Sequence, residues 1–106
     1  MNIAFYIDEM NLRGVANSTF QYALNNKKKL GNSSYIFFNK LNHRNKKEVI
    51  NNFKRKFITN GVKNFNEIEN YKDKYKIDFL YTQKSGNKDH WNSKKIKTIV
   101  HAVYPQ

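Results

Sequence analysis

Three short segments of the chain carry residue types that could bind or activate a substrate. Segment 8–17 has an arginine and a glycine ahead of a helical pattern, segment 83–86 has a lysine, a serine and a glycine, and segment 101–106 begins with a histidine. Backbone amides and a cation at a helix start favour an anion, and a histidine can orient or deprotonate a hydroxyl. The candidate substrate-binding residues are Asp8, Asn11, Arg13, Gly14, Lys84, Ser85 and Gly86, and the candidate catalytic residue is His101.

Each of these segments ends or follows a run that predicts a β-strand. Ile3–Ile7 is apolar at every position, which is typical of a strand covered on both faces. Further short runs predict four more strands, over 35–38, 57–59, 77–81 and 98–103. The polar stretches between them predict a turn at Asn60-Gly61, a turn over 82–86, and a loop over 87–95 with Trp91 folded back on the body.

Apolar residues at helical spacing predict three helices between the strands. The first has Val15, Ala16, Phe20, Ala23 and Leu24 on one side. Lys27–Lys29 closes it, where cations complement the helix dipole, and Gly31 can take the left-handed conformation that follows a helix. The second helix covers about 46–56. The third is capped by Asn64 or Asn66, with these residues on its inner side: Phe65, Ile68, Tyr71 and Tyr75.

The alternation of these elements predicts one Rossmann-like domain over residues 1–106. Its class is α/β, a three-layer sandwich with a mostly parallel sheet. Right-handed crossovers favour the strand order 3-2-1-4-5. Strands one and four are then neighbours where the strand order reverses, and the three polar segments meet at one edge. Ligands of such sheets bind in the crevice at this point.

The composition excludes several classes of protein. Aromatic residues make up 15% of the chain, which excludes a disordered polypeptide. The chain has no cysteine for disulfides or thiolate metal sites, which favours a reducing compartment, and we expect a cytoplasmic protein. No apolar run approaches the roughly 20 residues that span a bilayer, and no secretory signal is evident. No pair of histidines or carboxylates has the spacing of metal ligands, so we expect no metal.

The formal net charge of +12 suggests an anionic partner, such as a nucleic acid, an anionic ligand or a lipid headgroup. However, asparagine is about as common as lysine, and lysine far outnumbers arginine, which is typical of an AT-rich coding sequence. We therefore do not expect nucleic acid as the main partner. The alternative function is a small basic module for nucleic acid or anionic surfaces, which would use Lys27–Lys29 and Lys54–Lys56 away from the crevice.

The candidate residues are also compatible with purely structural roles, and two other α/β families require residues that this sequence lacks. His101, late in an apolar strand, can be a hydrogen-bonded core residue instead of a substrate contact. Gly14 can serve only a tight turn, with Arg13 in solvent. A dinucleotide-binding turn requires three glycines, whereas segment 8–17 has one, so no nicotinamide cofactor is expected. A phosphate-accepting receiver domain requires an aspartate that closes the third strand, where the sequence reads Phe-Ile-Thr-Asn-Gly.

Five stretches, spaced in this order along essentially all of the chain, resemble the start of a known family. They read Ile-Ala-Phe-Tyr-Ile-Asp, Asn-Leu-Arg-Gly-Val-Ala, Leu-Gly-Asn-Ser-Ser-Tyr-Ile-Phe-Phe, Ile-Asp-Phe-Leu-Tyr-Thr-Gln-Lys-Ser-Gly and Thr-Ile-Val-His-Ala-Val-Tyr. Their order and spacing resemble the N-terminal lobe of GT-B glycosyltransferases related to glycosyltransferase family 4. Within these, the sequence is most similar to a group found in giant algal viruses and environmental bacteria.

The resemblance implies a transferase that moves a sugar from a nucleotide-sugar donor to an acceptor hydroxyl. It implies that the N-terminal lobe shapes the acceptor side, and that the nucleotide-sugar is a co-substrate and not a cofactor. Arg13 and Gly14 would line the cleft between the lobes, and 84–86 would form its opposite wall. His101 would lie near the acceptor. The family usually has two glycines in the first turn, whereas this chain has Gly14 alone.

A complete GT-B enzyme also has a second Rossmann lobe, which binds the donor. These 106 residues match only the first part of the N-terminal lobe. We therefore expect the isolated chain to be a fragment that does not catalyse transfer, while the full-length enzyme would bind a nucleotide-sugar and a glycan acceptor.

Overall fold

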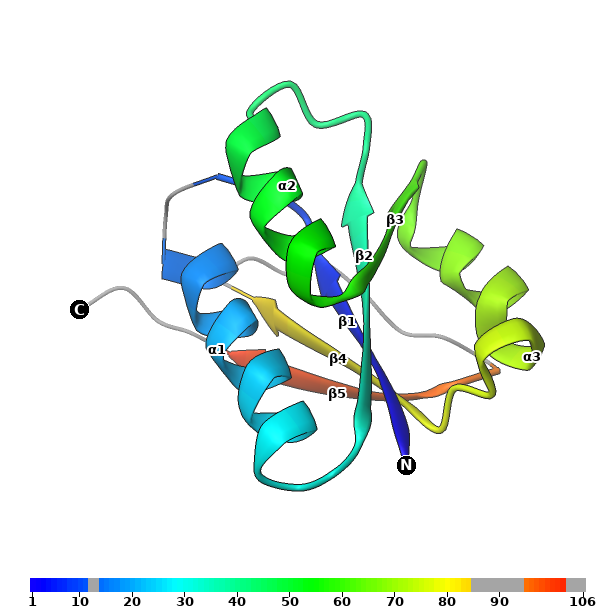
Figure 1. The fold of residues 1–106 in the computed structure, drawn as a ribbon. Coiled ribbons are helices and arrows are strands. Elements are labelled where there is room, and N and C mark those ends of the chain that lie inside the picture. The colour runs from blue at the N-terminus through cyan, green and yellow to red at the C-terminus, as the bar shows by residue number, and fades with distance from the viewer. Residues whose placement is uncertain (12–13, 85–94, 103–106) are drawn as a thin grey trace.

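The computed structural model describes residues 1–11, 14–84 and 95–102, and places a five-stranded parallel sheet between layers of helix (Figure 1). The strand order is β3-β2-β1-β4-β5, and every neighbouring pair is parallel, so the predicted fold class and order are confirmed. In chain order the elements are β1 (Asn2–Ile7), α1 (Gly14–Lys28), β2 (Ser33–Asn39), α2 (Lys47–Lys56), β3 (Ile58–Val62), the 3-10 helix η1 (Phe65–Tyr71), α3 (Lys72–Tyr75), β4 (Phe79–Lys84) and β5 (Lys97–Ala102).

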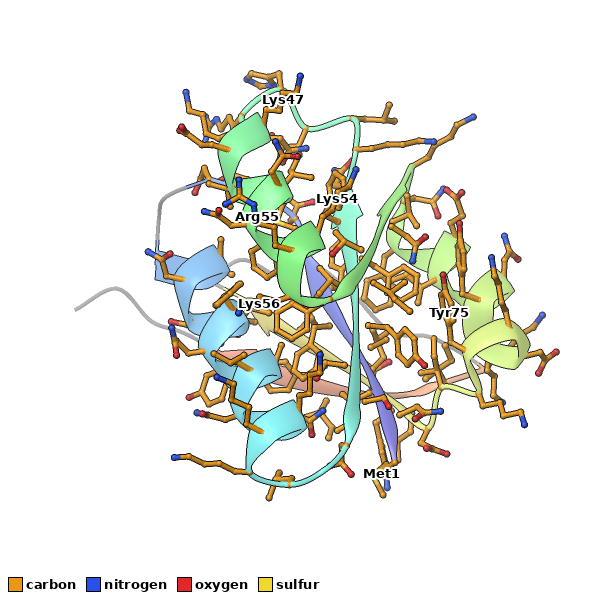
Figure 2. The ribbon with its side chains drawn as sticks, in the orientation of Figure 1. Met1, Lys47, Lys54, Arg55, Lys56 and Tyr75 are labelled. Atoms are coloured by element: carbon orange, nitrogen blue, oxygen red, sulfur yellow. The ribbon has the colours of Figure 1, made fainter. Side chains whose placement is uncertain are left out.

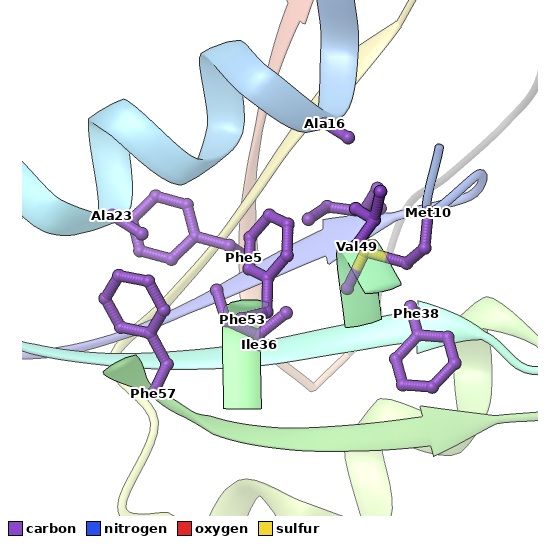
Figure 3. Packing of buried hydrophobic residues seen from close by; sticks show 10 residues of the cluster. Phe5, Met10, Ala16, Ala23, Ile36, Phe38, Val49, Phe53 and Phe57 are labelled. Carbon is purple, nitrogen blue, oxygen red and sulfur yellow. The ribbon is translucent and has the colours of Figure 1, made fainter. Parts of the chain in front are cut away.

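Alternation along β1 divides the core into two layers. Phe5 and Ile7 face α1 and α2, where they pack with Ala16, Ala23, Ile36, Val49 and Phe53 (Figure 3). Ala4 and Tyr6 face the opposite side and pack with Phe37, Phe65, Ile68 and Leu80. Figure 1 shows α1 and α2 together on one side of the sheet, with α3 apart from them. Because β1 is buried on both faces of the sheet, its sequence is a continuous apolar run.

The end of α1 is closed by buried polar contacts. Gly31 has a φ of +68°, so it adopts the left-handed conformation that was predicted after the first helix. The Asn26 side chain is buried, and its Nδ2 donates to Ser34 Oγ at 2.9 Å, while Ser34 Oγ donates to the Ala23 carbonyl at 2.9 Å. These contacts orient the start of β2 beneath the helix.

The third helical segment is confirmed, with an irregular form. Asn64 is its N-cap, because its side chain accepts a hydrogen bond from the Glu67 amide at 3.0 Å. The segment begins as the 3-10 helix η1 and continues as the short α3. The Tyr75 ring stacks on Tyr35 of β2, with 4.5 Å between centroids. This packing holds the segment against the sheet.

The third strand differs from the prediction. It runs from Ile58 to Val62, so Asn60-Gly61 lies within the ladder and is not a turn. Gly61 pairs with Phe38, and a Cβ added there would lie 2.9 Å from Lys40 Cβ. Gly61 therefore permits β3 to lie close to Lys40, which follows β2, and does not mark a chain-reversing turn.

The fourth strand also differs. It begins at Phe79, two residues later than predicted, and continues through Thr82 and Gln83 to Lys84. Thr82 can lie in a buried strand because its hydroxyl donates to the Tyr6 carbonyl at 3.2 Å. The predicted turn over 82–86 is therefore wrong for its first three residues. The predicted loop and Trp91 lie outside the described residues, apart from Lys95.

Within the described part of the chain, none of the helices has the length and hydropathy needed to cross a bilayer.

Candidate functional site

The candidate site lies at the carboxyl edge of the sheet, where the strand order reverses. β1 pairs with β2 on one side and with β4 on the other, from Ile3 opposite Phe79 to Tyr6 opposite Thr82. The segment after β1 and the end of β4 therefore emerge side by side. In open parallel sheets, ligands bind at such a reversal of strand order.

Asp8, predicted as a ligand residue, is engaged by its neighbours. Its Oδ1 accepts hydrogen bonds from the Tyr6 hydroxyl at 3.2 Å and from Asn39 Nδ2 at 3.1 Å, while its backbone oxygen accepts from Asn42 Nδ2 at 3.0 Å. Burial of the Tyr6 ring, together with the Asp8 charge and hydrogen bond, raises the pKa of the Tyr6 phenol well above its ordinary value of about 10. The proton therefore remains on Tyr6, which donates to the carboxylate.

Asn45 continues this network along the edge. Its Oδ1 accepts from the Met10 amide at 2.8 Å, and its Nδ2 donates to the Asn39 carbonyl at 2.8 Å. The Met10 carbonyl in turn accepts from the Lys46 amide at 2.6 Å. These bonds join the segment after β1 to the connection between β2 and α2. The first turn is thus held by asparagines that lie more than 30 residues away in the sequence.

Asn11 is buried beside the same segment, and its Nδ2 donates to Glu9 Oε2 at 3.1 Å. The other oxygen of Glu9 forms an ion pair with Arg44 at 3.2 Å. The Arg44 side chain is largely exposed, so this pair contributes little to stability. In these contacts Asp8 and Asn11 act as positioning residues for the turn.

Gly14 is the first residue of α1, and its backbone does not have the positive φ that would require glycine. A Cβ added to Gly14 would meet no atom within 4 Å. Among the described residues, the position beside Gly14 at the helix start is therefore unobstructed. An anion could approach the exposed amides there without contacting a side chain of residue 14.

Gln83 is a buried polar residue near the carboxyl end of β4. It is 3% exposed, and its Nε2 lies 3.4 Å from the Tyr81 hydroxyl, while its Oε1 has no hydrogen-bond partner among the described residues. Burial also raises the pKa of Tyr81. The Thr19 hydroxyl of α1 is likewise buried without a partner. A buried carbonyl oxygen without a donor is unusual in a folded protein, so Gln83 is a candidate acceptor for a ligand or water.

His101 lies in β5, opposite Gln83 of β4, and Lys84 lies opposite Ala102. The backbone therefore places both residues at the carboxyl edge. β5 is two strands away from β1, a separation of about 10 Å. Arg13, Ser85 and Gly86 fall outside the described residues. Of the predicted site, the structure brings to one edge the backbone positions of Asp8, Asn11, Gly14, Lys84 and His101.

Sequence reasoning missed the asparagines that hold this edge. Asn39, Asn42 and Asn45 lie in a polar stretch to which no role was assigned, although their spacing of three residues is a usable signal. Gln83 was assigned to a turn, and its burial became visible only when β4 was extended. Among the described residues, no group of three His, Cys, Asp or Glu side chains could hold a metal ion.

The two predicted lysine clusters meet at the other end of the molecule. Lys27 Nζ donates to the Lys56 carbonyl at 3.3 Å, so the ends of α1 and α2 lie side by side. A groove of about 580 Å³ is lined by Lys27, Lys54, Arg55 and Lys56 with the first residues of β2 and β3. These are the amino ends of the strands, so the clusters lie away from the candidate crevice, as predicted.

Compared with models of protein families, with curated proteins and with solved structures, the chain gives no significant match. The α/β fold with its parallel sheet is defined by the strand order and pairing alone.

Proposed function

We propose that this chain is the acceptor-side part of the N-terminal lobe of a GT-B glycosyltransferase. The enzyme would transfer a sugar from a nucleotide-sugar to a hydroxyl group of a glycan acceptor, without a metal. The donor-binding lobe of the family would be supplied from outside these 106 residues, so the isolated chain would not turn over. A cytoplasmic location belongs to the same proposal, because nucleotide-sugars and a cysteine-free chain both suit that compartment.

One observation carries the proposal: β1 and β4 are neighbours at the reversal of strand order, with the open start of α1 beside them. This is where open parallel sheets bind their ligands. The fold alone is compatible with many activities. The assignment to sugar transfer depends on the family-like stretches, two of which contain Gly14 and His101.

The proposed roles of single residues come from the family resemblance. Arg13, Gly14 and the residues 84–86 would contact the donor phosphates, and Asp8 and Asn11 would hold the first turn in place. His101 would orient the acceptor hydroxyl and take its proton. The acceptor oxygen would then form a bond to the sugar carbon while the bond from that carbon to the nucleotide diphosphate breaks, and the diphosphate would leave with the electron pair.

Binding can be tested by amide chemical-shift mapping with UDP-glucose and GDP-mannose at millimolar concentration. The largest shifts are expected at residues 8–11, 14–16 and 83–84. Gly14→Ala should weaken binding, because the added methyl group fills the space in front of the helix, while the fold tolerates it since no atom lies within 4 Å. Ser18→Ala, an exposed change on the same helix, is the matched control and should bind normally.

Shifts confined to the lysine groove, or equal binding by Gly14→Ala and wild type, would contradict this site.

The inactivity of the isolated chain is tested separately, by incubation with both nucleotide-sugars and a mixture of oligosaccharide acceptors. No glycoside should be detected by mass spectrometry. Robust turnover would refute the need for a second lobe.

A further inference from the structure

Positive charge is distributed unevenly along the chain. Between Met10 and Asn66 the sequence has twelve lysines and arginines and a single acidic residue, Glu48. Half of these cations lie on α1 and α2, which cover one face of the sheet: Lys27, Lys28, Lys47, Lys54, Arg55 and Lys56. The four acidic residues Glu67, Glu69, Asp73 and Asp78 belong instead to η1, α3 and the connection to β4. The face with α1 and α2 is therefore strongly cationic.

The cations on this face concentrate around the groove between the ends of α1 and α2. Figure 2 shows Lys54, Arg55 and Lys56 in the second half of α2 and Lys47 at its opposite end. A second hollow of about 330 Å³ adjoins the groove, because Arg55 and Lys56 line both. None of the described residues that line the two hollows is acidic. Lys28 and Lys29, which follow Lys27 at the end of α1, add two exposed cations to this edge.

Exposed aliphatic side chains lie at the same edge of the sheet. Leu30, just before β2, is 70% exposed, and Ile58, which begins β3 and lines the groove, is 54% exposed. Met1 is 63% exposed, and its carbonyl accepts from the Ser33 amide at 3.1 Å, which places it beside the start of β2. Exposed aliphatic side chains do not contribute hydrophobic burial to the stability of the fold. In a lipid interface, the same side chains can be removed from water.

We propose that this edge, formed by Lys27–Leu30, Lys54–Lys56 and Ile58, binds the surface of a bilayer that contains anionic phospholipids. The cations would contact lipid phosphates, and Leu30 and Ile58 would enter the region between headgroups and acyl chains. This surface is separate from the proposed sugar-transfer site, and the inference does not depend on that function. The carboxyl edge of the sheet would face away from the bilayer.

The aromatic residues of the groove favour a bilayer over a single-stranded nucleic acid. Binding of single strands uses aromatic faces on which bases stack. Phe57 is buried, and the Tyr35 ring stacks on Tyr75 at 4.5 Å. Leu30, Ile58 and the exposed lysines of this edge instead combine aliphatic and cationic side chains, which is the combination found on surfaces that bind the membrane interface.

The test is co-sedimentation of the chain with vesicles of phosphatidylcholine alone and with 30% phosphatidylglycerol. Binding is expected only with phosphatidylglycerol. The triple variant Lys28→Gln, Lys29→Gln, Lys54→Gln should bind more weakly by about fivefold per lysine, on the order of a hundredfold in total. The matched control Lys40→Gln, Lys47→Gln, Lys63→Gln removes the same charge from exposed lysines elsewhere and should retain most of the binding.

The double variant Leu30→Ser, Ile58→Ser separates a bilayer from other polyanions. Both residues are exposed, so the fold should persist, which far-UV circular dichroism would verify. Vesicle binding should fall severalfold, while the weak affinity for a dT20 oligonucleotide should not change. Equal loss in the two lysine triple variants, or an oligonucleotide affinity that exceeds vesicle affinity at 150 mM salt, would overturn the proposal.

Discussion

At the scale of single residues, the polar side chains of the carboxyl edge have two distinct uses. Asp8 and Asn11 form hydrogen bonds with other protein groups, and these bonds hold the segment after β1 in position. Gln83 has a buried carbonyl oxygen without a hydrogen-bond donor among the described residues. Two features of the described edge therefore remain for a ligand, namely that oxygen and the unobstructed position beside Gly14 at the start of α1.

The Tyr6–Asp8 contact predicts a loss of stability at alkaline pH. Because the pKa of Tyr6 is raised in the folded protein, the unfolded chain loses this proton first as the pH rises. The contribution of Tyr6 is fully present below about pH 10 and declines above it, by up to about 1.4 kcal/mol per pH unit. Urea unfolding at pH 8, 10 and 11 should show a shallower decline for Tyr6→Phe than for wild type.

The half-exposed Tyr22 provides the control for this measurement. Tyr22→Phe should keep the alkaline decline of the wild-type protein. Tyr6→Phe should also be less stable at pH 8 by about 1 kcal/mol, because it loses the hydrogen bond to Asp8. Identical pH dependence of the two variants would show that Tyr6 is not held in its protonated form by the fold.

At the scale of elements, the irregular helix between β3 and β4 depends on its first turn. η1 and α3 together are short, and isolated helices of this length are not stable in water. Asn64 accepts from the Glu67 amide, and the Glu67 carboxylate accepts from the Lys63 amide at 2.7 Å. This reciprocal arrangement resembles a capping box, and it directs Phe65 and Ile68 into the core.

Replacement of the cap predicts a difference between two neighbouring asparagines. Asn64→Ala should lower the free energy of unfolding by about 1 kcal/mol, because the Glu67 amide loses its side-chain acceptor and keeps only the weaker contact with the Asn64 carbonyl at 3.2 Å. Asn66→Ala, at an exposed position within η1, should change it by less than about 0.5 kcal/mol. Chemical denaturation followed by tyrosine fluorescence measures both. A larger loss of stability for Asn66→Ala would show that Asn64 is not the residue that caps the helix.

At the scale of the whole molecule, the fold gathers like charges that the sequence spreads over many residues. The net charge is +12, and the ends of α1 and α2 bring two lysine clusters into contact. Some of these cations are used locally, since Lys27 donates to the last carbonyl of α2 and others complement the helix dipoles. The remainder repel one another in the compact state.

This repulsion predicts that salt stabilises the protein. Raising NaCl from 10 to 300 mM shortens the screening length from about 30 Å to below 10 Å. The free energy of unfolding in urea should then rise by on the order of 1 kcal/mol, because the expanded chain is less affected by repulsion. The triple variant Lys28→Gln, Lys29→Gln, Lys54→Gln should show a smaller rise. A midpoint that falls with salt would mean that attractive pairs dominate instead.

Much of this architecture is predictable from local pattern. Ile3–Ile7 and 35–38 are continuous apolar runs. Such runs are typical of strands that are buried on both faces of a parallel sheet. The order 3-2-1-4-5 follows from the handedness of the crossovers. The errors fell at Asn60-Gly61 and at Thr82, where polar or glycine residues lie inside strands. Local composition predicts turns there, whereas strand pairing and one hydrogen bond to Tyr6 decide otherwise.

The sequence by itself determined the class of fold, the order of its elements and the edge at which candidate residues gather, because periodicity and crossover handedness are properties of the chain. Only the tertiary structure decided the partners of those residues. It brings Asn39 to Asp8 and Lys27 to Lys56, pairs separated by 31 and 29 residues. Such contacts depend on how the strands and helices pack together, which no local pattern of residues specifies.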